Sequence, residues 1–271
     1  MTTESRNTEQ KPLKLAVIIY HKDVHKYPLE WVVKCVKSIQ QQTHKKFDVF
    51  EIDYGNGGTQ IYPGSIWESK AMETHAHAHN YLLDKAFFWG YDNVMNVNVD
   101  DYYSPDRFEK QLVYAEQGYD VISSNFYNVD ENDNIKDTMK MHDRNIIQEA
   151  NNNMNIIAHP VVCYSKKFWT TCARLNPEEI PRDDFELWKR SYESGNYRFI
   201  ILPDFLLYYR VHSGKVSRDK EKDNQPNADR VIKSSWDNIP LQQTGINAKP
   251  TTDEEKDAHD KAREEWLKTN R

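Results

Sequence analysis

The 271-residue chain has few cysteines and no long apolar run. Its three cysteines, Cys35, Cys163 and Cys172, are an odd number without metal-ligand spacing, so we interpret them as reduced thiols in a cytoplasmic protein. No stretch approaches the ~20 apolar residues of a membrane-spanning helix. The polar segment 1–11 lacks the apolar core of a signal peptide. The sequence therefore predicts no transmembrane segment and a cytoplasmic location.

The chain also lacks an excess of positive charge. Its formal net charge is −6, which argues against a nucleic-acid partner, because proteins that bind nucleic acids carry basic patches or stripes. The hydrophobic share is low at 38%, but aromatic residues reach 12%, and disordered chains are poor in aromatics. The length suits one large domain with an appendage.

Strands and helices alternate along the first hundred residues. Apolar patterns predict strands over 15–20, 47–53 and 94–99, and helices over about 29–42 and 75–89. Such a β-α-β-α-β series is typical of a parallel, doubly wound α/β sheet.

The remaining segments are less regular. We expect a helix over 105–117, strands over 121–126, 156–164 and 199–203, and a hairpin or mobile loop in the Asn- and Asp-rich stretch 128–155.

Both ends of the chain are expected to be appendages. Residues 1–12 form a disordered tail, and 218–271 form a polar linker with a C-terminal helix over about 253–268. The capping-box pattern Thr252-Asp253-Glu254-Glu255 supports that helix.

Two adjacent carboxylates follow the apolar strand segment 94–97. In Asn98-Val99-Asp100-Asp101 they stand at a strand end, which is where α/β sheets bind their ligands. An ordinary Asp-rich turn is the alternative interpretation.

Two later segments carry similar polar groups. Asp183 and Asp184 open a predicted helix that is anchored by aromatic residues, although an Asp at a helix start is commonly only a cap. Arg210 and His212 end a predicted strand and lie on the same face of the pleat.

Taken in this order, the three segments resemble the family 2 glycosyltransferases of the GT-A fold. Upstream segments extend the resemblance: 15–20 is similar to the first strand of that family, 51–58 to its second strand and Asp-Asp-Gly-Ser type turn, and 75–86 to its Ala-Arg-Asn helix. The similarity covers 13–217, about three quarters of the chain.

The resemblance implies a GT-A type α/β fold. It has a Rossmann-like, mostly parallel central sheet flanked by helices, and a smaller mixed sheet on the acceptor side. Residues 13–104 would form the nucleotide-binding half and 105–217 the acceptor half.

The resemblance also implies an activity. An inverting, metal-dependent enzyme would move a sugar from a nucleoside-diphosphate sugar, UDP by default, to a hydroxyl of a glycan, protein or lipid-linked acceptor. Its divalent cation, Mn²⁺ or Mg²⁺, would be held by Asp100, with Asp101 as second choice and His212 nearby. Carboxylate oxygens suit both ions, and Mn²⁺ also accepts an imidazole.

Further roles are implied by position. Asp184 would be the catalytic base, and Asp183 would orient the acceptor or cap the helix. The expected donor-binding residues are Tyr20, Asp53, His79, Asn98, Asp100 and Arg210. Tyr20 either stacks on the nucleotide base or is a packing aromatic.

Two other functions stay open. A non-catalytic nucleotide- or sugar-binding relative is suggested by Asn98 and His79, which stand where the family has Asp and Arg. A sugar nucleotidyltransferase would place a Gly-rich phosphate loop after the first strand, but the first glycine here is Gly55.

Overall fold

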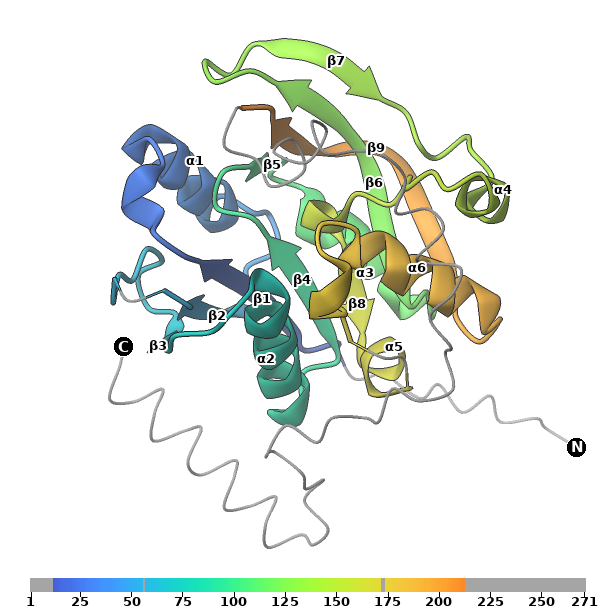
Figure 1. The fold of residues 1–271 in the computed structure, drawn as a ribbon, viewed down its shortest axis with the longest axis horizontal. Coiled ribbons are helices and arrows are strands. Elements are labelled where there is room, and N and C mark those ends of the chain that lie inside the picture. The colour runs from blue at the N-terminus through green and yellow to red at the C-terminus, as the bar shows by residue number, and fades with distance from the viewer. Residues whose placement is uncertain (1–11, 56, 172–173, 213–271) are drawn as a thin grey trace, which may run out of the picture.

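The computed structural model describes residues 12–55, 57–171 and 174–212 (Figure 1). The expected N-terminal tail, apart from its last residue, lies outside the described residues. So do Cys172, the linker and the C-terminal helix.

Nine strands in the described residues form one sheet, in the order β3-β2-β1-β4-β8-β6-β9-β5, with β7 paired to β6. The strands are β1 (Leu15–His21), β2 (Phe47–Asp53), β3 (Ile66–Ser69), β4 (Asn93–Val97), β5 (Tyr102–Tyr103), β6 (Val121–Val129), β7 (Ile135–Met139), β8 (Cys163–Ser165) and β9 (Phe199–Arg210).

The sheet has a parallel half and a mixed half. Strands β1 to β4 are parallel to their neighbours within that half, as expected from the β-α-β-α-β series. Strand β8 runs antiparallel to both β4 and β6, and so joins the two halves. The mixed strands expected on the acceptor side are therefore present, as a continuation of the central sheet.

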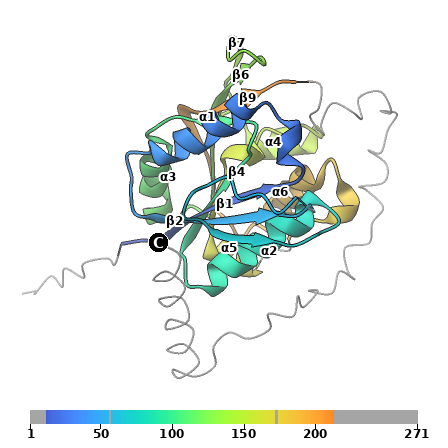
Figure 2. The same ribbon diagram turned by 90° about the vertical axis from the view of Figure 1, so that its left-hand side faces the viewer.

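Helices cover both faces of the sheet (Figure 2). They are α1 (Leu29–Gln40), α2 (His75–Phe88), α3 (Arg107–Glu116), α4 (Ile146–Asn151), α5 (Lys166–Thr171) and α6 (Asp183–Glu193), with short 3-10 turns η1 (Val24–Lys26), η2 (His159–Val161) and η3 (Pro177–Glu179). One buried core includes residues of α1 and α3, and a second includes residues of α2, α5 and α6. The result is a three-layer α/β fold.

Two helices show why these segments fold as they do. In α1 the buried Trp31, Cys35 and Ile39 recur at helical spacing, which gives the helix one apolar face. Helix α2 begins after Thr74, whose side chain accepts a hydrogen bond from the backbone N–H of His77. That cap places His75 at the first position of the helix.

The second half agrees with expectation at one place and differs from it at two. The stretch 128–155 contains the β6–β7 hairpin and α4, so the hairpin interpretation is correct. The strand expected over 156–164 is wrong for most of its length: η2 occupies 159–161, and the strand β8 begins only at Cys163. Strand β9 continues beyond 203 because a register shift against β6 accommodates Pro203, whose carbonyl accepts a bond from Asn125.

Within the described part of the chain, no helix is long and apolar enough to cross a membrane.

Candidate functional site

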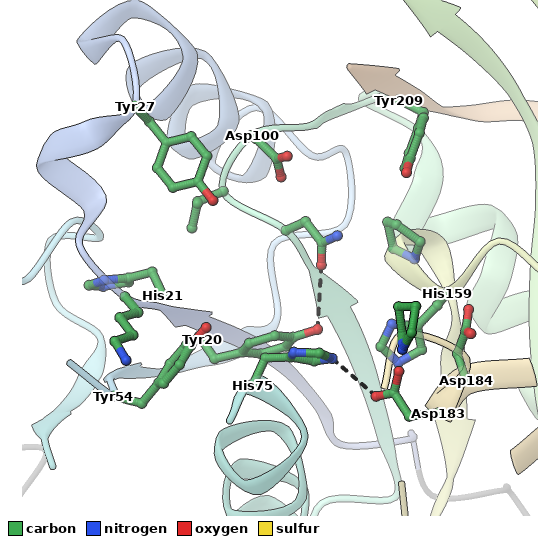
Figure 3. Close-up of a pocket in the computed structure, with 15 residues that line it drawn as sticks. Tyr20, His21, Tyr27, Tyr54, His75, Asp100, His159, Asp183, Asp184 and Tyr209 are labelled. Carbon is green, nitrogen blue, oxygen red and sulfur yellow. Dashed lines mark hydrogen bonds and ion pairs between the residues drawn. The ribbon is translucent and has the colours of Figure 1, made fainter. Parts of the chain in front are cut away.

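A cavity of about 250 Å³ opens near the carboxyl ends of the parallel strands (Figure 3). Its walls come from both halves of the fold. They include Tyr20, His21, Lys22, Tyr27, Tyr54, His75, Asn98, Val99, Asp100, His159, Pro160, Pro181, Asp183, Asp184 and Tyr209. This is the edge at which open α/β sheets bind ligands.

Asp100 lines one side of the cavity and contacts His212, which is not itself among the lining residues. The Nε2 atom of His212 lies 3.1 Å from Oδ2 of Asp100, although the residues are 112 positions apart. The imidazole packs against the rings of Tyr27 and Trp31, at centroid distances of 6.2 and 5.0 Å. The two groups expected to hold a cation are therefore held together.

Asp101 lies on the other side of the same turn. Its carboxylate is buried and accepts a hydrogen bond of 2.8 Å from the backbone N–H of Arg210. Asp100 lines the cavity and Asp101 does not. The two adjacent acids thus have different surroundings, and Asp101, the second choice as a cation ligand, is hydrogen-bonded to the end of β9.

Arg210 is buried beside this turn rather than in the cavity wall. Its Nε donates to the carbonyl of Asp100 at 3.0 Å, and its guanidinium stacks 4.7 Å from the ring centre of Trp31. The expected contact with a diphosphate is not supported by this position.

The donor set of Asp100 and His212 fits a divalent cation such as Mn²⁺, since it joins a carboxylate oxygen to an imidazole nitrogen. Among the described residues, no group of three or more His, Cys, Asp or Glu side chains is arranged to hold a metal ion. The pair would therefore supply two ligands and leave the others to phosphate oxygens and water, a common arrangement for Mg²⁺.

The acid pair at the start of α6 lines the opposite side of the cavity (Figure 3). Oδ2 of Asp183 lies 3.1 Å from Nε2 of His75. Burial acts to raise the pKa of Asp183, but the hydrogen bond and charge of His75 outweigh it, so this pKa is lowered. Asp183 is therefore ionised at neutral pH.

Asp184 has a different environment. Its carboxylate accepts hydrogen bonds from the backbone N–H of Phe185 at 2.7 Å and from the side chain of Asn155 at 2.9 Å. Burial, followed by the negative charge of Asp183, raises the pKa of Asp184 to about 7. Two neighbouring carboxyl groups with separated pKa values are a common basis for acid–base chemistry.

Aromatic rings line the nucleotide-binding half of the cavity. Tyr20 lies there with Tyr27 and Tyr54, and its hydroxyl is 3.5 Å from Oδ1 of Asn98. The ring of Tyr20 also packs edge-on against His79, at a centroid distance of 5.5 Å. Tyr20 thus lines the cavity and packs against the core, and its stacking on a nucleotide base stays a prediction.

Like Arg210, the expected donor-binding residues Asp53 and His79 lie outside the set that lines the cavity. Asp53 is 1% exposed, and its carboxylate accepts backbone bonds from Gly55 and Thr59, which shape the turn after β2. His79 is fully buried, and burial followed by the neighbouring His159 lowers its pKa well below the usual range. A neutral, enclosed imidazole is poorly placed to bind a diphosphate.

Several cavity residues were missed by sequence reasoning. His75 lies one helical turn before His79, so its spacing was the available signal. His159 had none, because it lies in a segment interpreted as a strand. His21 lies 3.1 Å from Glu51, and this buried pair joins the ends of β1 and β2.

No protein-family model matches the chain. It is 31% identical over 134 residues to an uncharacterized glycosyltransferase of Haemophilus influenzae, covering 47% of this chain and 48% of that protein. It is 26% identical over 146 residues to an uncharacterized glycosyltransferase of Methanocaldococcus jannaschii, covering 52% and 50%. The chain therefore spans about half the length of the curated relatives it matches.

Solved structures are similar over a larger part of the chain. S. aureus TarS in complex with UDP-GlcNAc has a TM-score of 0.57 at 16% identity, covering 76% of this chain and 61% of that one. The mannosyltransferase PcManGT from Pyrobaculum calidifontis, in complex with GDP-Man and Mn²⁺, has a TM-score of 0.55 at 12% identity, covering 79% and 61%. In sequence the chain is thus related to curated glycosyltransferases, and in fold it is a GT-A protein.

Proposed function

We propose that the protein is an inverting, metal-dependent glycosyltransferase that moves a sugar from a nucleoside-diphosphate sugar to an acceptor hydroxyl. The observation that carries the proposal is one cavity with Asp100, the hydrogen-bond partner of His212, on one side and Asp184 on the other. The relatives named as glycosyltransferases, and the neighbours solved with UDP-GlcNAc or with GDP-Man and Mn²⁺, support it. UDP is the default donor nucleotide.

At the donor side, Tyr20, Tyr27 and Tyr54 offer aromatic walls for the nucleotide. Asp100 and His212 would hold Mn²⁺ or Mg²⁺, which as a Lewis acid neutralises charge on the diphosphate leaving group. Asn98 also lines the cavity and offers an uncharged amide to the donor.

At the acceptor side, Asp184 takes the proton of the attacking hydroxyl. The hydroxyl oxygen then forms a bond to the anomeric carbon while the bond from that carbon to the diphosphate oxygen breaks. A single displacement of this kind inverts the carbon and needs one base. General base catalysis of this kind contributes about 10²–10⁴-fold. Asp183, kept ionised by His75, orients the acceptor hydroxyl without competing for its proton.

The second candidate is a non-catalytic relative that binds a nucleotide or sugar. The burial of His79, at the position where the family has Arg, favours this alternative. The acceptor class, whether glycan, protein or lipid-linked, is not distinguished by the cavity residues.

A panel of nucleoside-diphosphate sugars tests the proposal. The protein is incubated with each donor and Mn²⁺, with and without a mixture of acceptors, and the released nucleoside diphosphate is measured. We expect acceptor-dependent release from at least one donor. Tight binding of UDP or GDP without release from any donor would favour the binding relative.

A further inference from the structure

Arg210 lies where four parts of the fold meet. It ends β9, stacks on Trp31 of α1, contacts the turn after β4, and reaches the tip of the β6–β7 hairpin. Its side chain is 1% exposed. A buried guanidinium must satisfy its N–H groups within the protein, so its partners indicate its role.

Those partners belong to two segments. Nε donates to the carbonyl of Asp100 at 3.0 Å. Nη1 donates to the carbonyl of Asp130 at 3.1 Å, and Nη2 lies 2.7 Å from Oδ1 of Asp133. The backbone N–H of Arg210 adds the bond to Asp101. Arg210 thus joins the turn that carries Asp100 to residues 130–133, which form the hairpin tip.

The hairpin tip is itself fixed to the body of the protein. Oδ2 of Asp133 lies 2.7 Å from Nζ of Lys34, and Nε1 of Trp31 donates to the carbonyl of Glu131 at 3.1 Å. The carboxylate of Asp130 accepts backbone bonds from Asn132 and Asn134, which stiffens the turn. The hairpin lies at the edge of the fold (Figure 1), and its tip is held at α1 and β9 by these contacts.

The same contacts fix His212. The ring of Trp31 contacts both side chains. Cζ of Arg210 lies 4.7 Å from its centroid, and the imidazole centroid of His212 lies 5.0 Å from it. Arg210 also restrains the backbone of Asp100, the partner of that imidazole. A shift of the guanidinium would therefore alter the separation of Asp100 and His212.

We propose that Arg210 is a positioning residue for the Asp100–His212 cation pair, and that the hairpin tip acts on this pair through Arg210. Cation affinity then depends on Asp133, whose nearest charged partners are Arg210 and Lys34. The proposal rests on the proposed function, because it assumes that Asp100 and His212 hold the cation.

Calorimetric titration of UDP, with and without Mn²⁺, tests this inference on four variants of the full chain. Arg210→Lys keeps the charge but loses the planar guanidinium and its several N–H donors. Mn²⁺-dependent UDP binding should therefore weaken about 10–100-fold, the usual loss when a group that orients metal ligands is removed. Asp133→Asn removes the ion pairs of Asp133 with Arg210 and Lys34, and this side chain is 35% exposed, so a loss of about threefold to fivefold is expected. UDP binding without Mn²⁺ should stay unchanged in both variants.

The matched control is Asp137→Asn, because Asp137 is an exposed acid on β7 of the same hairpin. It should bind UDP and Mn²⁺ like the wild type. Asp100→Asn tests the cation site itself, and its Mn²⁺-dependent binding should be lost. If Arg210→Lys does not fold, as judged by its melting temperature, Asp133→Asn and Asp137→Asn decide the question.

The outcomes separate the two proposals. Persistent Mn²⁺ dependence in Asp100→Asn overturns the cation site, and with it this inference. Loss in Asp100→Asn together with wild-type affinity in Arg210→Lys and Asp133→Asn overturns the inference alone. Equal weakening of UDP binding with and without Mn²⁺ in Arg210→Lys would show that Arg210 contacts the donor, which also overturns it.

Discussion

Asp183 and Asp184 are adjacent in the chain, yet their carboxyl groups differ in proton affinity. Asp183 has the imidazole of His75 at 3.1 Å, whereas the hydrogen bonds of Asp184 come from the Phe185 backbone and the Asn155 amide. Burial and the charge of Asp183 leave Asp184 with a pKa of about 7. A base works best when its pKa lies near the working pH, so this position suits Asp184 to proton abstraction.

The pH dependence of transfer follows from that pKa. Asp184 must be ionised to accept a proton, so kcat/KM should increase as pH rises through about 7 and level off about one unit above it. Initial rates between pH 5 and 9 at saturating Mn²⁺ measure this profile. A rate that is already constant from pH 5 upward would assign the base to a group with an ordinary carboxyl pKa.

Asp184→Asn should separate catalysis from stability. The amide keeps the shape but has no basicity, so transfer should fall by about 10²–10⁴-fold while donor binding persists. The raised pKa of Asp184 means that its charge opposes folding above about pH 7 and is absent well below it. The variant should therefore melt at the same or a higher temperature than the wild type at pH 8.

A helix-capping role for Asp184 predicts the opposite kinetic result. Asn caps a helix about as well as Asp, so a near-normal transfer rate in this variant would leave Asp184 a structural residue. Asp183 would then be the next candidate for the base.

Asp100 and His212 should contribute unequally to cation binding. Phosphate oxygens and water can replace an imidazole more easily than the carboxylate of Asp100. We expect Asp100→Ala to abolish Mn²⁺-dependent nucleotide binding, and His212→Ala to weaken it. Calorimetry at several Mn²⁺ concentrations measures both, and equal losses in the two variants would contradict this ranking.

The local pattern of apolar residues predicted several strands and helices correctly. Strands β1, β2 and β4 and helices α1, α2 and α6 follow the apolar periodicity of their own residues. The segment 156–164 failed because its apolar residues suggested a strand, while Pro160 lacks the N–H that a central strand needs.

The sequence predicted the candidate site only in part, because some of its contacts come from residues far apart in the chain. Sequence order correctly brought Asp100 to His212, and the acid pair of α6 to the same cavity. It could not show that Arg210 faces inward, since that orientation depends on Asp133 and the hairpin tip, far away in the chain. Nor could it show that His79 is enclosed by rings of other elements.

The loop between β2 and β3 depends on one buried acid. Glu51 of β2 accepts backbone hydrogen bonds from Ile61 and Tyr62 and a side-chain bond from Ser65, and it lies beside His21. Glu51→Ala would leave these donors without a partner, so a loss of about 3–5 kcal/mol in the free energy of unfolding is expected. Urea denaturation at pH 7 measures it. A loss below about 1 kcal/mol would mean that water replaces the carboxylate.

Ligand binding should stabilise the whole fold, because the cavity draws on both halves of the sheet. A ligand that binds only the folded state stabilises it by about 2.7 kcal/mol at a concentration 100 times its Kd. The melting temperature should therefore rise more with UDP and Mn²⁺ together than with either alone. Purely additive shifts would indicate independent sites for the nucleotide and the cation.

The position of β9 late in the chain has a consequence for folding. Asp100 belongs to the part of the chain that is synthesised first, but His212 follows the last described strand, 112 residues later. Long-range pairing of this kind forms slowly, because distant segments must find each other. In a nascent or refolding chain, β1, β2 and β4 can thus form before His212 reaches Asp100 and the two can bind a cation together. Mn²⁺-dependent nucleotide binding would then appear only in the last phase of folding, and would report that the chain is complete through β9.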